Sequence, residues 1–259
     1  MFSRNRLYDE LAHLWPLVSP PEDYADEAQV WRDLLRRRLG PGQHQVLELG
    51  VGGGHNLSHL TADFHATAVD LSPRMLEHSR RLNPGVEHHV GDMRAVRLGR
   101  LFRAVLIHDA ASYLVTEDDI RQTLATAAAH LDSGGVLVMA PDFYRETFKD
   151  NSAGYDVHVG NDGTVLTYFE YFYDPDPSDT HVEMLIVFVI RRGAELRVEE
   201  DRHTLGLFPM TTWLSLMEDA GFAAEAEAGA AGGDDGRQQY LLVGTLRSTA
   251  NDLPQLRPL

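Results

Sequence analysis

A short apolar stretch that runs straight into a group of glycines restricts the fold of this 259-residue chain more than any other feature. Val46–Leu49 has the length and composition of a buried strand, and Gly50, Gly52, Gly53 and Gly54 follow it. Glycine has no Cβ, so a ligand can approach the main chain closely at such a turn. A strand, a glycine turn and a helix in this order are typical of nucleotide-binding α/β folds. The turn is therefore the first candidate for a binding site.

Strand-like and helix-like segments alternate on either side of this turn. Further strands are expected over 66–69, 86–90, 104–107 and 136–140, and helices over 26–39, 55–62, 73–82 and 117–131. Ser72 and Pro73 are a favourable N-cap and first residue for the helix over 73–82. Gly134-Gly135 is expected to end the helix over 117–131. This alternation indicates a parallel sheet covered by helices on both faces.

The pattern changes after residue 150 and later returns. Asn161-Asp162-Gly163 is typical of a hairpin turn, and β-rich runs follow over 166–173, 182–191 and 195–204. A helix over 211–220 and a strand over 240–245 then resume the α/β pattern. We expect one domain over 1–247, with a lid over 1–25 and an antiparallel insert over 152–206, followed by a flexible tail over 248–259.

The balance of charges narrows the choice of partners. The chain has 39 acidic and 23 basic residues, a formal net charge of −16, and a strongly negative surface repels nucleic-acid phosphates and anionic lipids. It contains no cysteine, which excludes disulfides, thiolate nucleophiles and cysteine-ligated metals. Met1–Leu11 lacks the apolar core of a signal peptide, and the apolar runs are too short to span a bilayer. We expect a cytoplasmic protein that acts on a small molecule, without a nucleic-acid or membrane partner.

The glycine turn distinguishes two classes of ligand. A dinucleotide-binding turn requires Gly-x-Gly-x-x-Gly, but His55 occupies the third position counted from Gly50, and Leu57 occupies it counted from Gly52. Glu48 instead precedes the first glycine by two residues. A carboxylate there would repel a pyrophosphate and attract a cationic aminoacyl group, such as that of S-adenosylmethionine (AdoMet).

Two further acids follow neighbouring strands. Asp70 ends the second strand, where a carboxylate can accept hydrogen bonds from ribose hydroxyls. Asp92 follows the third strand and is expected to accept from an adenine amino group, while Met93 packs on the ring. Three acids at adjacent strand ends suit a nucleoside that has many donors and no phosphate. Solvated loop acids are the alternative interpretation.

These residues resemble the AdoMet-binding motifs of class I methyltransferases. The resemblance rests on Glu48–Gly54, Val69–Ser72 with Met75, and Gly91–Met93, and it covers residues 5–246. It implies a Rossmann-like, doubly wound α/β fold with a mostly parallel seven-stranded sheet, AdoMet as cofactor and S-adenosylhomocysteine as product. The implied cofactor-binding residues are Glu48, Gly50, Gly52, Asp70, Leu71, Asp92, Met93 and His108.

A narrower similarity points to bacterial N-methyltransferases that dimethylate nucleotide-linked amino sugars. It is carried by Tyr8-Asp9, Asp23–Ala25, Glu27-Ala28, Gly91–Arg94, Arg97–Arg100, Glu146–Phe148 and Leu207-Phe208. In that family an aromatic-rich N-terminal segment closes over the cofactor, which implies this role for Trp15 and Tyr24. The chain departs from the family at its glycine motif, usually Asp-x-Ala-Cys-Gly-Thr-Gly, and at His108–Tyr113, where the family is rich in serine and glycine.

The end of the fourth strand is the expected place for the chemistry, because ligands of open α/β sheets lie beyond the carboxyl ends of the strands. His108 is a candidate general base, Asp109 a candidate partner for an ammonium group, and Tyr113 a candidate pocket wall. A strand-capping role for His108 and a helix-capping role for Asp109 are the structural alternatives. His55 and His59 have metal-like spacing but no evident third ligand, so no metal is expected.

The sequence therefore predicts an AdoMet-dependent methyltransferase of a small molecule, with N-methylation of an amine or amino sugar as the leading subtype. O-methylation of a carboxylate or hydroxyl is one alternative, and an AdoMet-binding protein without activity is the other. Tyr168, Glu170 and Phe172 share one face of a predicted strand and are candidates for a substrate wall. The sequence leaves open whether the protein forms a homodimer.

Overall fold

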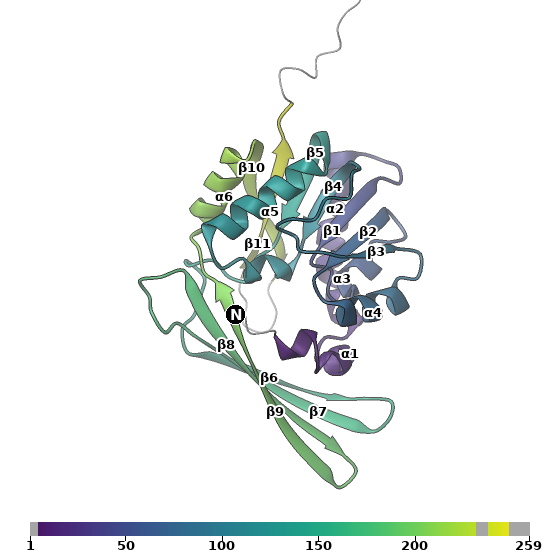
Figure 1. The fold of residues 1–259 in the computed structure, drawn as a ribbon, viewed down its shortest axis with the longest axis vertical. Coiled ribbons are helices and arrows are strands. Elements are labelled where there is room, and N and C mark those ends of the chain that lie inside the picture. Colours follow the sequence, from purple (N-terminus) through teal and green to yellow (C-terminus); the bar gives the residue numbers. More distant parts are fainter. Residues whose placement is uncertain (1–4, 232–237, 249–259) are drawn as a thin grey trace, which may run out of the picture.

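Two separate sheets organise the chain in the computed structural model, which describes residues 5–231 and 238–248 (Figure 1). The first has seven strands in the order β10-β11-β5-β4-β1-β2-β3, and the second has four in the order β6-β7-β8-β9. The strands of the first sheet are β1 (Gln45–Leu49), β2 (His65–Asp70), β3 (Glu87–Val90), β4 (Phe102–Ile107), β5 (Leu131–Met139), β10 (Phe222–Ala231) and β11 (Gln238–Leu246). The predicted Rossmann-like sheet with an antiparallel block is confirmed.

Helices cover both faces of the seven-stranded sheet, as a doubly wound fold requires. On one face α2 (Ala25–Leu39) contributes Trp31, Leu34 and Leu35 to a core that also takes in α3 (His55–Ser58) and α4 (Pro73–Leu82). On the other face α5 (Glu117–Ala129) and α6 (Met210–Asp219) bury Ile120, Leu124 and Trp213. β1 to β5 run parallel, and β11 and β10 add an antiparallel edge.

Most of the expected elements form close to their predicted bounds. The Ser72 side chain accepts a hydrogen bond from the backbone N–H of Met75, which confirms it as the N-cap of α4. The helix expected over 55–62 is shorter, because α3 ends at Ser58. The antiparallel strand β10 was not anticipated at all.

The expectation that Gly134-Gly135 ends a helix is wrong. Helix α5 ends at Ala129, and both glycines lie inside β5, which already begins at Leu131. Leu131 is buried and pairs with Phe102, and the register between β4 and β5 shifts after that pair. Gly134 has a φ of +74°, which glycine adopts without strain, so the strand accommodates the irregularity there.

The four-stranded sheet packs its inner face against the N-terminal arm, residues 5–24. Its strands are β6 (Ser152–Val159), β7 (Thr164–Tyr173), β8 (His181–Arg192) and β9 (Glu195–Gly206). The arm consists of η1 (Arg6–Tyr8), η2 (Ala12–Leu14), α1 (Trp15–Val18) and η3 (Pro21–Tyr24). Leu7, Leu11 and Leu14 of the arm share a buried core with Phe188 and Leu205 of the sheet. Figure 1 shows α1 between this sheet and the α/β layers.

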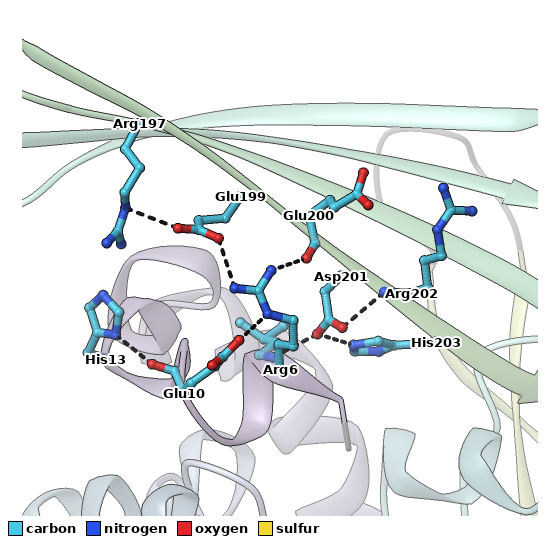
Figure 2. Close-up of polar contacts among 10 residues, drawn as sticks. Arg6, Glu10, His13, Arg197, Glu199, Glu200, Asp201, Arg202 and His203 are labelled. Carbon is cyan, nitrogen blue, oxygen red and sulfur yellow. Dashed lines mark hydrogen bonds and ion pairs between the residues drawn. The ribbon is translucent and has the colours of Figure 1, made fainter. Parts of the chain in front are cut away.

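Polar contacts hold the arm to the four-stranded sheet and to helix α4 of the α/β layers. Arg6 pairs with Glu199 of β9 at 2.8 Å, and Asp9 pairs with Arg74 of α4 at 2.9 Å. Figure 2 shows the Arg6 guanidinium bridging Glu10 on the arm and Glu199 on the strand above it. The arm therefore lies closed between the two layers in this structure.

Within the described part of the chain, no helix is long and apolar enough to cross a membrane. Cytoplasmic residence and the predicted domain bounds stay predictions. The flexible tail expected over 248–259 falls outside the described residues from position 249 onward.

Candidate active site

The register of the parallel strands brings the candidate residues to one edge of the sheet. Glu48 of β1 pairs with Leu106 of β4, and Ile107 of β4 pairs with Met139 of β5. The residues that follow these strands therefore lie side by side. A Cβ placed on Gly50 would lie 2.3 Å from the Cβ of Ala110, so the glycine turn packs directly on the segment after β4.

The glycines of the turn have different structural roles. Gly50, Gly52 and Gly54 have φ values of +79°, +54° and +76°, which side chains disfavour. At Gly53 an added Cβ would lie 2.2 Å from the Trp15 indole nitrogen, whereas at Gly52 the nearest atom is 3.8 Å away. Gly53 thus makes room for the arm, and Gly52 leaves the main chain approachable.

Asp70 is fixed by backbone donors at the end of β2. Its two carboxylate oxygens accept hydrogen bonds from the N–H groups of Gly52 and Ser72, each at 2.7 Å. Burial raises the pKa of Asp70, and these hydrogen bonds partly oppose the rise. The next residue, Leu71, is 68% exposed, which is unusual for a leucine and suits contact with an apolar ligand surface.

Asp92 is held by a neighbouring arginine. Arg94 donates to both carboxylate oxygens at 2.7–3.2 Å and also reaches Asp119 of α5 at 2.6 Å. The hydrogen bonds from Arg94 hold the pKa of Asp92 below its usual range. Met93 packs partly buried against the core. The predicted contact of Asp92 with adenine stays a prediction.

Glu48 stands out as a buried acid with an unsatisfied atom. Its exposed fraction is 2%, and none of the described residues forms a hydrogen bond with its Oε2 atom. Burial raises the pKa of Glu48 to about 8. A buried acceptor without a partner costs free energy, so a cationic donor beside Glu48 would be strongly favoured.

His108 lies between two carboxylates. Its Nε2 atom is 2.7 Å from Glu27 Oε1 and its Nδ1 atom is 3.1 Å from Asp109 Oδ1, while the ring is buried against Trp31 and Tyr24. Burial alone would lower the pKa of His108, but the charges of Asp109 and Glu27 raise it well above its usual value. An imidazolium has no free lone pair, so this geometry favours a cationic His108 over the general base suggested by the sequence.

The same three residues meet a geometric condition for metal binding. One donor atom from each of Glu27, His108 and Asp109 lies within 4.8 Å of the others. A protonated His108 lies within ion-pair distance of both carboxylates and balances part of their charge without an ion, although its Nε2 atom forms no hydrogen bond with the described residues. The expectation of no metal stays a prediction.

Asp142 also belongs to this site, although no local sequence pattern singles it out. It follows β5, and its backbone N–H donates to the Ser112 hydroxyl at 2.8 Å. The side chain keeps accessible surface, yet protein groups surround it so closely that desolvation raises its pKa well above the usual value, with the Asp109 charge adding to the effect. Asp109 and Asp142 therefore form an acidic pair at the ends of β4 and β5.

The arm brings aromatic side chains to the glycine turn. Trp15 stacks on His55 with ring centroids 5.8 Å apart. The ring centroid of Tyr24 also lies 5.8 Å from those of His55 and His108. Tyr113 lies beside the arm as well, because its hydroxyl is 2.6 Å from that of Tyr8. The predicted aromatic residues thus converge on the turn. Tyr8, Asp201 and His203, which extend the Tyr113 contact, were not selected from the sequence as site residues.

The inner face of the four-stranded sheet turns toward this region. Tyr168 and Phe172 pack partly buried against the core shared with the arm. Burial raises the pKa of Glu170, which lies between them on β7, to about 7. The face that the sequence suggested as a substrate wall is therefore the one directed inward.

Comparison with known proteins identifies relatives over nearly the whole chain. Residues 46–135 match the profile of a methyltransferase domain. A curated relative from Streptomyces venezuelae, dTDP-3-amino-3,4,6-trideoxy-α-D-glucopyranose N,N-dimethyltransferase, is 34% identical over 224 residues, covering 86% of this chain and 92% of the relative.

Solved structures agree with that relationship. The sugar N-methyltransferase KedS8 from Streptoalloteichus superposes with a TM-score of 0.80 at 26% identity, covering 96% of both chains. The AdoMet-bound amino pentose methyltransferase CalS10 from Micromonospora echinaspora gives a TM-score of 0.73 at 28% identity, covering 86% of this chain and 91% of the other.

Proposed function

The chain belongs to the AdoMet-dependent sugar N-methyltransferases, and from this premise we propose that it methylates the amino group of an amino sugar. The Streptomyces venezuelae relative acts, by its name, on a dTDP-linked 3-amino sugar, to which it adds two methyl groups. AdoMet is the methyl donor of this family: it carries an activated methyl group on a sulfonium sulfur.

The residues around the glycine turn fit this cofactor. Glu48 has a buried carboxylate oxygen without a partner among the described residues, which suits the cationic amino group of the methionine part. Asp70 is oriented by two backbone N–H groups and retains lone pairs for the ribose hydroxyls. The open approach at Gly52 lets the main chain contact the ligand, and Leu71 and Met93 offer apolar surface to the adenine.

The acidic pair Asp109 and Asp142 is the observation that supports an amine as the methyl acceptor. Both follow strands at the edge where the cofactor residues meet: Asp109 lies 3.1 Å from His108, and the backbone N–H of Asp142 donates to Ser112 at 2.8 Å. A positively charged or hydrogen-bond-donating nitrogen is favoured there, whereas an acceptor carboxylate would be repelled. This observation favours N-methylation over methylation of a carboxylate.

Proximity and orientation supply most of the rate in a direct displacement on an activated methyl group. Trp15, Tyr24 and the inward face of β7 limit access of water to this region, and Tyr168 and Glu170 offer an aromatic surface and a carboxylate to the sugar. Asp109 holds the nitrogen, and the His108 ring lies 3.1 Å from the Asp109 carboxylate.

The experiment is incubation of the purified protein with AdoMet and dTDP-linked 3-amino and 4-amino deoxysugars. Mass spectrometry should show an increase of one or two methyl groups on the sugar, with an equal amount of S-adenosylhomocysteine. The matched control is the same sugar with a hydroxyl in place of the amine, which should remain unchanged. Methylation of the hydroxyl analogue at a comparable rate would contradict the proposal, as would binding of AdoMet without turnover on any amine. Amino sugars already joined to an aglycone, tested in parallel, would decide whether the nucleotide is required.

A further inference from the structure

A chain of hydrogen bonds connects the four-stranded sheet to the N-terminal arm. His203 Nε2 lies 2.8 Å from Asp201 Oδ2, and His203 Nδ1 lies 2.7 Å from the hydroxyl of Tyr113. That hydroxyl is in turn 2.6 Å from the hydroxyl of Tyr8. Figure 2 shows the first of these links, with Asp201 and His203 projecting from β9 above the arm. Four side chains from three distant segments thus form one continuous path.

Its inner end is buried. His203 is 0% exposed and Asp201 is 4% exposed. Among the described residues, the ionisable groups that contact the His203 ring are Asp201 on β9, Tyr113 on η4 (Asp109–Tyr113) and Tyr8 on η1. Its partner across the sheet, Met184 on β8, is apolar. Burying two ionisable groups costs free energy of folding, so a role limited to holding the arm is disfavoured.

The direction of each hydrogen bond follows from the acid at the inner end. Burial would raise the pKa of Asp201, but hydrogen bonds from His203 and from the Leu7 N–H keep it below its usual value, so the group is a carboxylate that only accepts. His203 therefore donates through Nε2, and in a neutral imidazole Nδ1 then accepts from Tyr113. Tyr113 consequently accepts from Tyr8.

With the hydrogen bonds in this order, the Tyr8 oxygen keeps free lone pairs and can accept a proton from a group that is not part of the hydrogen-bond path. Tyr8 stands at the junction of the two halves of the site. Its backbone carbonyl accepts from Ser72, whose own N–H binds Asp70. Its hydrogen-bond partner Tyr113 ends the η4 segment that begins at Asp109. Burial raises the pKa of the Tyr8 hydroxyl, and the charges of Asp142, Asp109 and Asp70 add to this effect.

We propose that Tyr8, Tyr113, His203 and Asp201 form a proton relay that removes the proton from the acceptor nitrogen. The inference rests on the proposed function, because it requires an amine acceptor. Tyr8 is the catalytic residue that touches the nitrogen, whereas His203 and Asp201 are positioning residues that act through the two tyrosines.

The step balances within the relay. The acceptor ammonium gives one proton to the Tyr8 oxygen, the Tyr8 proton passes to Tyr113, and the Tyr113 proton passes to His203 Nδ1, which becomes an imidazolium paired with the Asp201 carboxylate. The freed lone pair forms the nitrogen–carbon bond while the carbon–sulfur bond breaks and its electrons go to sulfur. The methylated nitrogen leaves as an ammonium, and His203 returns its proton along the same path to solvent before the next turnover.

The test compares His203→Asn with wild type in kcat and KM from pH 6 to 10, with AdoMet and the dTDP-linked amino sugar that the wild type methylates. Asparagine can still accept a hydrogen bond from Tyr113 but cannot take up a proton. Near pH 7 we expect kcat to fall by about 100-fold, the low end of the range typical of general acid–base catalysis. The loss should shrink as pH rises, because the amine then loses its proton to water, and KM for AdoMet should change less than about twofold. Tyr113→Phe should give the same pH-dependent loss.

Glu199→Gln is the matched control, because Glu199 lies on the same strand and holds the same arm through Arg6 without joining the relay. It should keep the wild-type pH profile. A loss in His203→Asn that is equal at every pH, or no loss, would refute the relay and indicate a structural latch. A wild type that methylates no amine would refute the proposed function itself, and the relay with it.

Discussion

Replacing Glu48 by glutamine should stabilise the free protein while weakening its hold on the cofactor. The buried carboxyl has a pKa of about 8 because burial penalises its charged form, against an ordinary value near 4.5. Between these values the folded protein keeps a proton that the unfolded chain has lost, so the stability of wild type falls as pH rises through this window. Each unit of pH costs about 1.4 kcal/mol, and the full window is worth several kcal/mol. Glutamine has no charge to bury and avoids this penalty.

In cofactor binding the order should be the opposite, with wild type binding more tightly than Glu48→Gln. Loss of a hydrogen bond between charged groups costs about 1.5–3 kcal/mol, or roughly 10- to 100-fold in affinity. Thermal unfolding should show a gain in stability of Glu48→Gln over wild type that is larger at pH 8.5 than at pH 5.5, and calorimetry should show weaker binding of S-adenosylhomocysteine. Asp92→Asn is a useful comparison, because Arg94 lowers the pKa of that acid and no gain at pH 8.5 is expected. Equal cofactor affinity in Glu48→Gln and wild type would refute the role given to Glu48, and identical pH dependence of stability would refute its charge state.

Three further outcomes test other parts of the structure. Asp70→Ala should lose about 10- to 100-fold in affinity for S-adenosylhomocysteine by calorimetry, since ribose hydroxyls would lose their acceptor; unchanged affinity would oppose the assignment. Hydrogen exchange over residues 5–24 should slow when S-adenosylhomocysteine is added, because Trp15 packs on the glycine turn; equal exchange would indicate a static arm. The outer face of β6 exposes Tyr155, Val157 and Val159 by 72%, 55% and 69%, so we predict a homodimer through this face, which Val157→Glu should dissociate in light scattering.

Most of the fold could be predicted from local sequence patterns. The prediction failed where the composition of a segment favours a different secondary structure from the one it forms. The periodic strands and the capped helix α4 formed as expected because short-range signals and burial agree there. Phe222–Ala231 is rich in alanine and glutamate, which favour helices. It forms β10 because it pairs with β11 at the sheet edge, where Glu225 and Glu227 reach Arg38. Tertiary pairing of this kind leaves no local signal.

The candidate site was predictable on its cofactor side and only partly on its acceptor side. Glu48, Asp70 and Asp92 follow consecutive strands, so their order along the chain indicates their neighbourhood in space. Asp142 and His203 reach the site from separate segments, and their significance depends on distances that the sequence does not encode. The signal for Tyr8 was present in Tyr8-Asp9, which resembles the family, but nothing local linked it to Tyr113.

The arm explains why a methyltransferase of this kind combines two sheets that share no strand. Asp70, the acid assigned to the cofactor, accepts from Ser72, and Ser72 holds the backbone of Tyr8. Tyr8 then leads through Tyr113 to His203 on the second sheet. Ordering the arm would therefore complete the cofactor side and the proton path together, since one residue belongs to both. A catalytic path that exists only when the arm is in place would limit proton removal to complexes in which the methyl donor is already bound.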